Sequence, residues 1–324
     1  QTSWDTAYAS TNRCLETEKP IPFEEVYLPF VHVAREKLIA QVGASWQLLS
    51  EAVHISLERQ LLSKLASLGV RALELEFSKF KAQKQSADIS LTQQQGEHSN
   101  VQYQTFIEDL KTKELLSLFQ KYSVLARLVA TTIDFWVEEK VEFIQRLALD
   151  LPSIEQTFQE KTGHVVAIQF ELSDPHNRGR SVMAVTFESG LKVIYKPRGL
   201  TLEAIYFQLL SWCNQHFVET LYARSLHPFK ILKVIDCTTH GWMEYVEHLP
   251  CEDEVAAQRY YQRAGMLLCL VYLLQGNDCH QENLIASGEH PVLVDLETLL
   301  HPFAREVNPT QEVGAQSLAS EQFF

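Results

Sequence analysis

The spacing of apolar residues changes along this chain of 324 residues, and that change limits the folds it can adopt. Over residues 22–149 apolar side chains recur at helical spacing, as in Leu61, Leu62, Leu65 and Leu68. From residue 165 onward the pattern becomes short runs of β-branched and aromatic residues, which are typical of strands. The sequence therefore predicts a mostly helical region over 1–150 and a mixed region over 151–324, with a boundary at residues 150–153.

The order of the expected elements predicts an α+β fold. Strands are expected at 165–172, 181–187 and 191–195, with Ser189-Gly190 as a tight turn between the last two. A helix over 202–216, strands over 229–237 and 242–246, and an apolar helix over 254–275 follow. In the N-terminal half, helix is expected over 22–82 and 115–149, Gly69 is a candidate break, and the polar segment 83–100 is expected to be a mobile loop. A two-lobed, kinase-like fold is built in this order.

Composition excludes several classes of protein. Hydrophobic residues make up 46% of the chain and charged residues 21%, as in a globular protein, and no apolar run reaches the roughly 20 residues that span a bilayer. The beginning of the sequence has no secretion signal, and the six cysteines are widely and irregularly spaced, which favours a cytoplasmic protein without a zinc site. The net charge of −13 argues against general binding of nucleic acid.

The run GNDCHQENLIASGEHPVLVDLETLLH, residues 276–301, carries the strongest chemical pattern. Asp278 is followed after four residues by Asn283, and an apolar run then leads to a second acid, Asp295. ATP-dependent phosphotransferases hold their base and their magnesium with parts in this order. We therefore expect Asp278 to take the proton from an acceptor hydroxyl, and Asn283 and Asp295 to bind Mg²⁺ with oxygen ligands.

Two further residues of this run have two interpretations each. His280 is expected either to orient the acceptor and neutralise developing charge, or to fix the loop through a structural hydrogen bond. Glu297 points to the same side as Asp295 if the strand continues, since side chains two residues apart share one face of a strand. It is then a metal ligand or a second acid, and otherwise a solvated side chain.

A lysine upstream fits the same chemistry. Lys196 ends an expected strand in VIYKPRG, and from there its ammonium group can reach the α- and β-phosphates of ATP. Such a lysine needs a carboxylate on the next helix, and Glu203 is the nearest candidate. A lysine at a strand end is, taken alone, more often a surface residue, and the downstream motifs reverse that judgement.

The segment DPHNRGRS, residues 174–181, lies between two expected strands. Its glycine lets backbone amides approach a phosphate, and Arg178 and Arg180 add positive charge. Between residues 174 and 198 five basic and two acidic residues give a local charge of 5 − 2 = +3, which indicates a polyphosphate site or a solvated hairpin face. Asp174 and His176 in the same loop suit proton transfer near a substrate.

With these residues in view, the chain resembles the dehydratase domain of class II (LanM-type) lanthipeptide synthetases. The resemblance rests on DPHNRGRSV, VIYKPRGL, GNDCHQENLIASGEHPVL and DLETLLHP, and covers residues 165–302. It implies a lipid-kinase-like fold that uses ATP and Mg²⁺ to phosphorylate Ser and Thr of a ribosomally made leader–core precursor peptide, and then eliminates the phosphate. It further implies that Lys196 contacts the ATP phosphates, that Asp278, His280 and Asn283 phosphorylate, that Asp295 and Glu297 lie at the metal, and that Asp174 and His176 serve dehydration.

The family pattern continues beyond this sequence. In the family the dehydratase domain extends past DLE and is followed by a zinc-bearing cyclase domain. We therefore expect a truncated form without the cyclase zinc, whose cyclase domain is missing or separate. Two alternatives remain open: a lipid or small-molecule kinase of the same fold, and a non-catalytic remnant that binds peptide.

Overall fold

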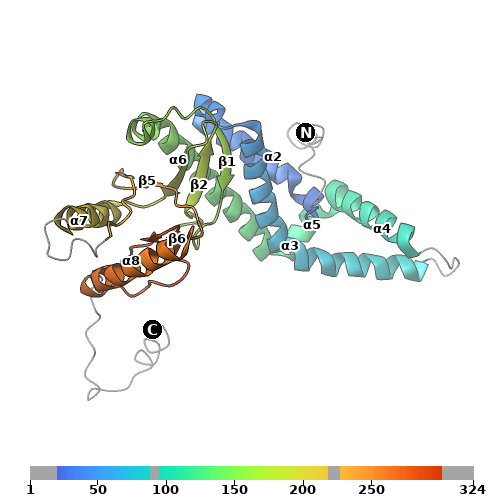
Figure 1. Cartoon of the computed structure of the whole chain (residues 1–324). Coiled ribbons are helices and arrows are strands. Elements are labelled where there is room, and N and C mark those ends of the chain that lie inside the picture. Colours follow the sequence, from blue (N-terminus) through green and yellow to red (C-terminus); the bar gives the residue numbers. More distant parts are fainter. Residues whose placement is uncertain (1–19, 88–94, 218–226, 301–324) are drawn as a thin grey trace, which may run out of the picture. The chain divides into compact units, whose positions relative to one another are not determined.

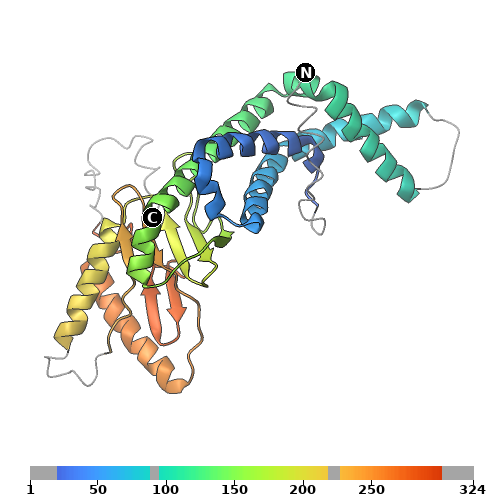
Figure 2. The same cartoon turned by 90° about the horizontal axis from the view of Figure 1, so that it is seen from above.

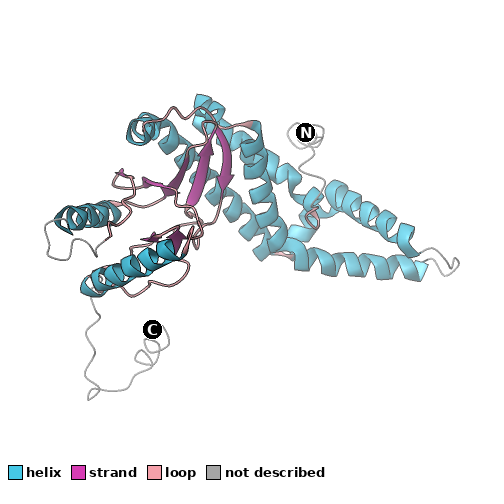
Figure 3. Ribbon diagram, viewed as in Figure 1, coloured by secondary structure: helices cyan, strands magenta, loops and turns pink. Residues whose placement is uncertain are grey.

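A computed structural model describes residues 20–87, 95–217 and 227–300 of the chain. Its contacts divide the chain into an N-terminal unit, Gln1–Thr201 with Leu232–Tyr245, and a C-terminal unit, Leu202–Ile231 with Val246–Phe324. Helices and strands are both present, so the predicted α+β class is confirmed (Figure 3). The likeness to two-lobed lipid kinases stays a prediction. No helix in the described ranges is both long and apolar enough to cross a membrane.

The first part of the N-terminal unit is helical, as its apolar periodicity predicts. Helices α2, α3 and α6 lie side by side in both views (Figures 1 and 2), and their facing side chains form much of the core. The helical elements are α2 (Glu24–Val42), a 3-10 helix (Gly43–Leu48), α3 (Glu51–Ala87), α4 (Gln95–Asp109), a π-helical turn (Leu110–Glu114), α5 (Leu115–Lys121) and α6 (Ser123–Phe158).

Gly69 does not break helix α3, and the reason is a close contact with helix α2. Tyr27 of α2 is only 1% exposed, and a Cβ atom at position 69 would lie 1.6 Å from its hydroxyl oxygen. Glycine at this position therefore lets the two helices approach each other. The helix tolerates it although glycine costs about 1 kcal/mol relative to alanine in a helix interior.

Two other expectations about the helices were wrong. Residues 83–87 and 95–100 are helical rather than a loop, and residues 88–94 lie outside the described ranges. In the first of these two stretches Gln, Lys and Ala form helix well even without an apolar stripe. Helix α6 continues through Pro152, buries Ile154 completely, and ends where Gln159 adopts a left-handed φ of 58°. The change from helix to strand thus comes after residue 158, later than the expected boundary at 150–153.

A five-stranded antiparallel sheet completes the N-terminal unit. Its strands, in spatial order, are β1 (Val165–Gln169), β2 (Met183–Phe187), β3 (Lys192–Lys196), β5 (Gly241–Glu244) and β4 (Val234–Asp236). The tight turn at Ser189-Gly190 is confirmed: the Gly190 N–H donates to the Phe187 carbonyl at 2.9 Å, and Gly190 has φ 95°. The register places Lys196 opposite Gly241.

Helix α6 packs on one face of this sheet. The ring of Phe143 lies 5.2 Å from that of Tyr195 on β3 and 6.3 Å from that of Trp242 on β5, measured between centroids. All three side chains are at most 2% exposed, and burial of each is worth roughly 1.5–3 kcal/mol. The sheet that carries Lys196 is therefore held by α6.

The C-terminal unit contains helix α7 (Thr201–Phe217), helix α8 (Glu254–Leu273) and the hairpin β6–β7 (Leu284–Ser287 and His290–Leu293). The unit begins at Leu202, so the first residue of α7 belongs to the N-terminal unit. Asp253 begins α8 by accepting the Ala256 N–H at 2.6 Å, a standard N-cap. Arg263 of α8 is 3% exposed and donates to the carbonyl oxygen of Glu289 at 3.0 Å and to its carboxylate at 3.0 Å. These bonds fix the hairpin against α8 ahead of the segment that carries Asp295.

Candidate functional site

The loop between α8 and β6 brings together three of the predicted site residues. The Asn283 side-chain amide donates to the Asp278 carbonyl oxygen at 2.9 Å and lies 3.4 Å from the Asp278 carboxylate. The His280 Nε2 atom lies 3.3 Å from the other carboxylate oxygen of Asp278. About half of the Asp278 and His280 side chains is exposed, at 56% and 48%, so a substrate can reach both.

Hydrogen bonding defines the tautomer of neutral His280. The Glu282 N–H points at Nδ1 of His280 at 3.2 Å, so Nδ1 acts as the acceptor. The ring proton of the neutral imidazole then lies on Nε2, which is 3.3 Å from the Asp278 carboxylate and 3.5 Å from the Asn283 amide nitrogen. The bond from the Glu282 N–H agrees with the interpretation in which His280 fixes the loop, and a role of His280 toward the acceptor stays a prediction.

The segment that follows β7 carries Asp295 and Glu297. The strand ends at Leu293, so the condition under which Glu297 would share a strand face with Asp295 is not met. Instead the Glu297 N–H points at the Asp295 carboxylate at 3.4 Å, as in a turn. Oxygen ligands for a divalent cation are present on both segments, in Asn283, Asp295 and Glu297, and their binding of Mg²⁺ stays a prediction.

In the N-terminal unit, residues 174–181 form a small hairpin. The N–H groups of His176 and Arg180 each donate to the other's carbonyl oxygen at 2.8 Å. Asn177, Arg178 and Gly179 between them have φ values of 42°, 69° and 95°, which reverse the chain. The side chains of Asp174 and His176 are exposed on this hairpin, where a substrate can reach them.

Both arginines of the hairpin are paired with glutamates of helix α6. Arg180 donates through Nε to Glu142 at 3.1 Å and through a terminal nitrogen to Glu138 at 3.2 Å, and Arg178 donates to Glu138 at 3.3 Å. The hydrogen bond from Arg180 lowers the pKa of Glu138. The positive charge of these two arginines is therefore paired with carboxylates of α6, and a phosphate would have to exchange with them.

Lys196 is buried, at 5% exposure, as the last residue of β3. Asp236, at the end of β4, holds the chain that follows Lys196: its carboxylate accepts the N–H of Leu200 at 2.9 Å and the hydroxyl of Thr201 at 2.6 Å. The same carboxylate accepts the N–H of Thr238 at 3.0 Å. The Thr201 hydrogen bond is the main cause of a lowered pKa at Asp236. We call this set of bonds the Asp236 clasp.

Sequence reasoning missed Asp236. The local sequence offers one sign of its role: an Asp side chain can accept the N–H of the residue two positions later, here Thr238, in an Asx turn. Glu203, the predicted partner of Lys196, is completely buried in the first turn of α7 and belongs to the C-terminal unit. The pairing of Lys196 with Glu203 stays a prediction.

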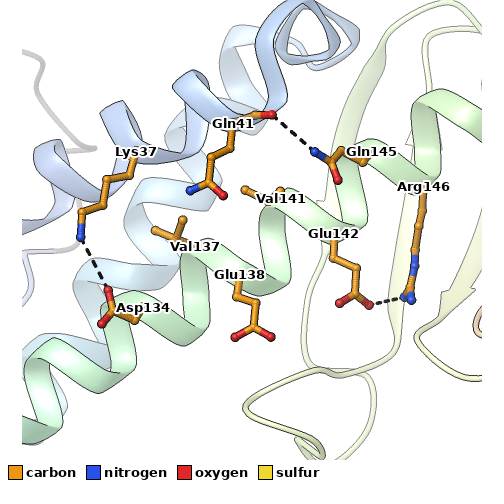
Figure 4. A pocket seen from close by; sticks show the side chains of 9 residues that line it. All are labelled: Lys37, Gln41, Asp134, Val137, Glu138, Val141, Glu142, Gln145 and Arg146. Atoms are coloured by element: carbon orange, nitrogen blue, oxygen red, sulfur yellow. Dashed lines mark hydrogen bonds and ion pairs between the residues drawn. The ribbon is translucent and has the colours of Figure 1, made fainter.

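A groove of about 770 Å³ lies on helices α2 and α6, outside the predicted site residues (Figure 4). Its acidic side chains have basic partners: Asp134 lies 3.6 Å from Lys37, and Glu142 pairs with Arg146. The groove borders the 174–181 hairpin through Glu138 and Glu142, which hold the hairpin's arginines. Its lining residues are Lys37, Gln41, Asp134, Val137, Glu138, Val141, Glu142, Gln145 and Arg146.

A cluster of Asp150, Cys237 and His240 has atoms of the types that bind metals. One carboxylate oxygen of Asp150 already accepts the His240 Nε2–H at 2.6 Å and the Trp242 Nε1–H at 2.9 Å. Burial raises the pKa of the Cys237 thiol to about 11. The two hydrogen bonds to Asp150 connect α6 to the β4–β5 hairpin.

Comparison with known proteins places the chain in a family. Residues 122–323 match the family model described as a domain of unknown function, DUF4135. Over 129 residues the chain is 34% identical to the lacticin 481/lactococcin biosynthesis protein LcnDR2 of Lactococcus lactis subsp. lactis, a match that covers 40% of this chain and 14% of that relative. Since the family model matches more than half of the chain, this protein belongs to the DUF4135 family, whose domain is found in LanM-type lanthipeptide synthetases.

Proposed function

We propose that this chain dehydrates Ser and Thr side chains of a ribosomally made precursor peptide, by phosphorylation with ATP and elimination of the phosphate. The observation that carries the proposal is the contact of Asp278, His280 and Asn283 within one loop, in a chain of a family found in lanthipeptide synthetases. The proposal includes a lipid-kinase-like, two-lobed fold, a precursor peptide as partner, a cytoplasmic location and a cyclase that is separate from these residues.

Phosphorylation is the first step of the proposed reaction. The Asp278 carboxylate accepts the proton of the substrate hydroxyl, and the freed oxygen attacks the γ-phosphorus of ATP. The bond from that phosphorus to the β–γ bridging oxygen breaks, and ADP leaves. We assign His280 a supporting role in this step, because its Nε2 atom lies 3.3 Å from the Asp278 carboxylate.

The nucleotide needs positive charge and metal ligands. Lys196 is fixed at the end of β3, with the Asp236 clasp holding the residues after it, and we assign it to the ATP phosphates. Asn283, Asp295 and Glu297 offer the oxygen atoms for Mg²⁺, which when bound would neutralise charge on the phosphates. Arg178 and Arg180 would add positive charge only after exchange with Glu138 and Glu142.

Elimination is the second step. A base removes the α-proton of the phosphorylated residue, a double bond forms between Cα and Cβ, the Cβ–O bond breaks, and phosphate leaves. Asp174 and His176 lie exposed on one hydrogen-bonded hairpin, and we assign them to this proton transfer. The left-handed residues 177–179 and the paired N–H groups of His176 and Arg180 hold their backbone in place.

The test is incubation of the protein with a leader-bearing precursor, ATP and Mg²⁺, followed by intact-mass spectrometry. We expect a gain of phosphate and then the loss of one water for each modified Ser or Thr. Asp278→Asn and Lys196→Met should give no phosphate gain, whereas His176→Ala should accumulate phosphorylated peptide. Glu282→Gln, which changes an exposed acid in the same loop, is the matched control and should behave like the unmodified protein.

The same experiment separates the alternatives. Stable phosphorylated peptide from the unmodified protein, with no water loss, would indicate a kinase only. Peptide binding without any ATP-dependent change of mass would indicate a binding module and would contradict the proposal.

A further inference from the structure

We propose that Thr298 is a positioning residue that connects the Asp278 loop to the Asp295 segment, and that this connection sets the geometry of the base and the metal ligands. The inference rests on the proposed function. Thr298 lies three residues after Asp295, and its hydroxyl oxygen faces the Asp278 N–H at 3.3 Å. The contact therefore acts on the backbone of the proposed base itself.

Two backbone hydrogen bonds lie on either side of this contact. The Val294 N–H donates to the Asn283 carbonyl oxygen at 2.9 Å, and the Leu300 N–H donates to the Leu274 carbonyl oxygen at 2.7 Å. The two segments are thus joined near both of their ends. Thr298 supplies the connection at the middle, where a side chain rather than the backbone makes the bond.

Packing below the loop supports the same connection. Leu296 and Leu299 are 1% and 5% exposed, on either side of Thr298 along the chain. A Cβ atom at Gly276 would lie 2.6 Å from Leu299 Cδ2 and 3.0 Å from Val271 Cγ1. Glycine at 276 therefore lets the loop lie directly on Leu299, which brings the Asp278 N–H within reach of Thr298.

In this arrangement Thr298 has a different role from its neighbours Asp295 and Glu297. Asp295 and Glu297 present carboxylates to a cation, while Thr298 keeps their segment in register with Asn283 and Asp278. Thr298 itself touches no reacting atom, so it is not a catalytic residue. A misplacement of about 1 Å in such a site can lower a rate on the order of a hundredfold, which is why a single hydroxyl can matter here.

The experiment compares Thr298→Val, which removes the hydroxyl at nearly constant shape, with Thr298→Ser, which keeps it. The first readout is hydrogen exchange of the Asp278 amide, which we expect to become roughly five- to tenfold faster in Thr298→Val. The second readout is the affinity for Mn²⁺ in the presence of ATP, measured from the loss of the EPR signal of the free ion. We expect Thr298→Val to weaken this affinity about tenfold. Thr298→Ser should stay within about twofold of the unmodified protein in both readouts.

The outcomes distinguish this inference from the proposed function. If Thr298→Val matches the unmodified protein in amide exchange and in Mn²⁺ binding, the inference is wrong even if peptide is dehydrated. If Thr298→Val weakens Mn²⁺ binding but the unmodified protein never changes the mass of the peptide, the connection stands and the proposed function fails. If Thr298→Ser is as impaired as Thr298→Val, the hydroxyl is not the cause and the inference is overturned.

Discussion

Replacing Asp150 by alanine tests the connection between helix α6 and the β4–β5 hairpin. Asp150 is 7% exposed, and one of its carboxylate oxygens accepts hydrogen bonds from His240 and Trp242, which are 6% and 0% exposed. The alanine leaves both buried N–H donors without this partner. Each loss costs about 1–3 kcal/mol, so the free energy of unfolding should fall by about 2–6 kcal/mol.

The assay is urea unfolding followed by tryptophan fluorescence, since Trp242 lies at the site of the change. Asp150→Asn keeps one acceptor oxygen, which can accept both bonds, so its loss should be smaller than that of the alanine. Asp134→Ala, also on α6, is the control: Asp134 is 70% exposed and 3.6 Å from Lys37, so its removal should change stability by less than about 0.5 kcal/mol. A loss of under about 0.5 kcal/mol in Asp150→Ala would refute the reasoning.

Three further predictions concern other contacts. Gly69→Ala should destabilise the protein by about 1–3 kcal/mol in the same urea assay, because the new Cβ atom clashes with Tyr27. Combining it with Tyr27→Phe should relieve part of this loss. The control is Gly265→Ala in α8, where a Cβ atom meets nothing within 4 Å, and it should be neutral or stabilising. Burial raises the pKa of Glu76, but hydrogen bonds from Lys121, Lys79 and Tyr122 outweigh it and lower the pKa to about 2. Because the folded pKa lies below the unpaired value of 4.5, the stabilisation of the folded state by Glu76 is complete above about pH 4.5 and is lost as the pH falls toward 2. This stabilisation is worth about 1–3 kcal/mol. Glu76→Gln should abolish this part of the acid dependence of the free energy of unfolding. Asp236→Ala should raise the KM for ATP several-fold with a smaller change in kcat, since it releases the backbone after Lys196; an unchanged KM would contradict the role of the Asp236 clasp.

Local patterns in the sequence predicted the element types well. The β-branched runs and the Ser189-Gly190 turn gave the β2–β3 hairpin, because strand alternation and turn chemistry are properties of neighbouring residues. The loop with Asp278 and Asn283 was predictable for the same reason, since its residues lie close together along the chain.

Features that depend on distant residues were not predictable. Gly69 looked like a helix break because its partner, Tyr27, lies on another helix. The arginines of the 174–181 hairpin looked like free positive charge, although Glu138, 40 residues before Arg178, neutralises them. Asp236 escaped notice because its partners Leu200 and Thr201 lie more than thirty residues away.

Transfer of phosphate from ATP to the precursor peptide in a single turnover tests the central claim most directly. The measurement is the intact mass of the peptide after mixing with excess enzyme, ATP and Mg²⁺, for the unmodified protein, Asp278→Asn and Glu282→Gln. The account predicts phosphorylated and then dehydrated peptide from the unmodified protein and from Glu282→Gln, and unchanged peptide from Asp278→Asn. Equal modification by Asp278→Asn would contradict it.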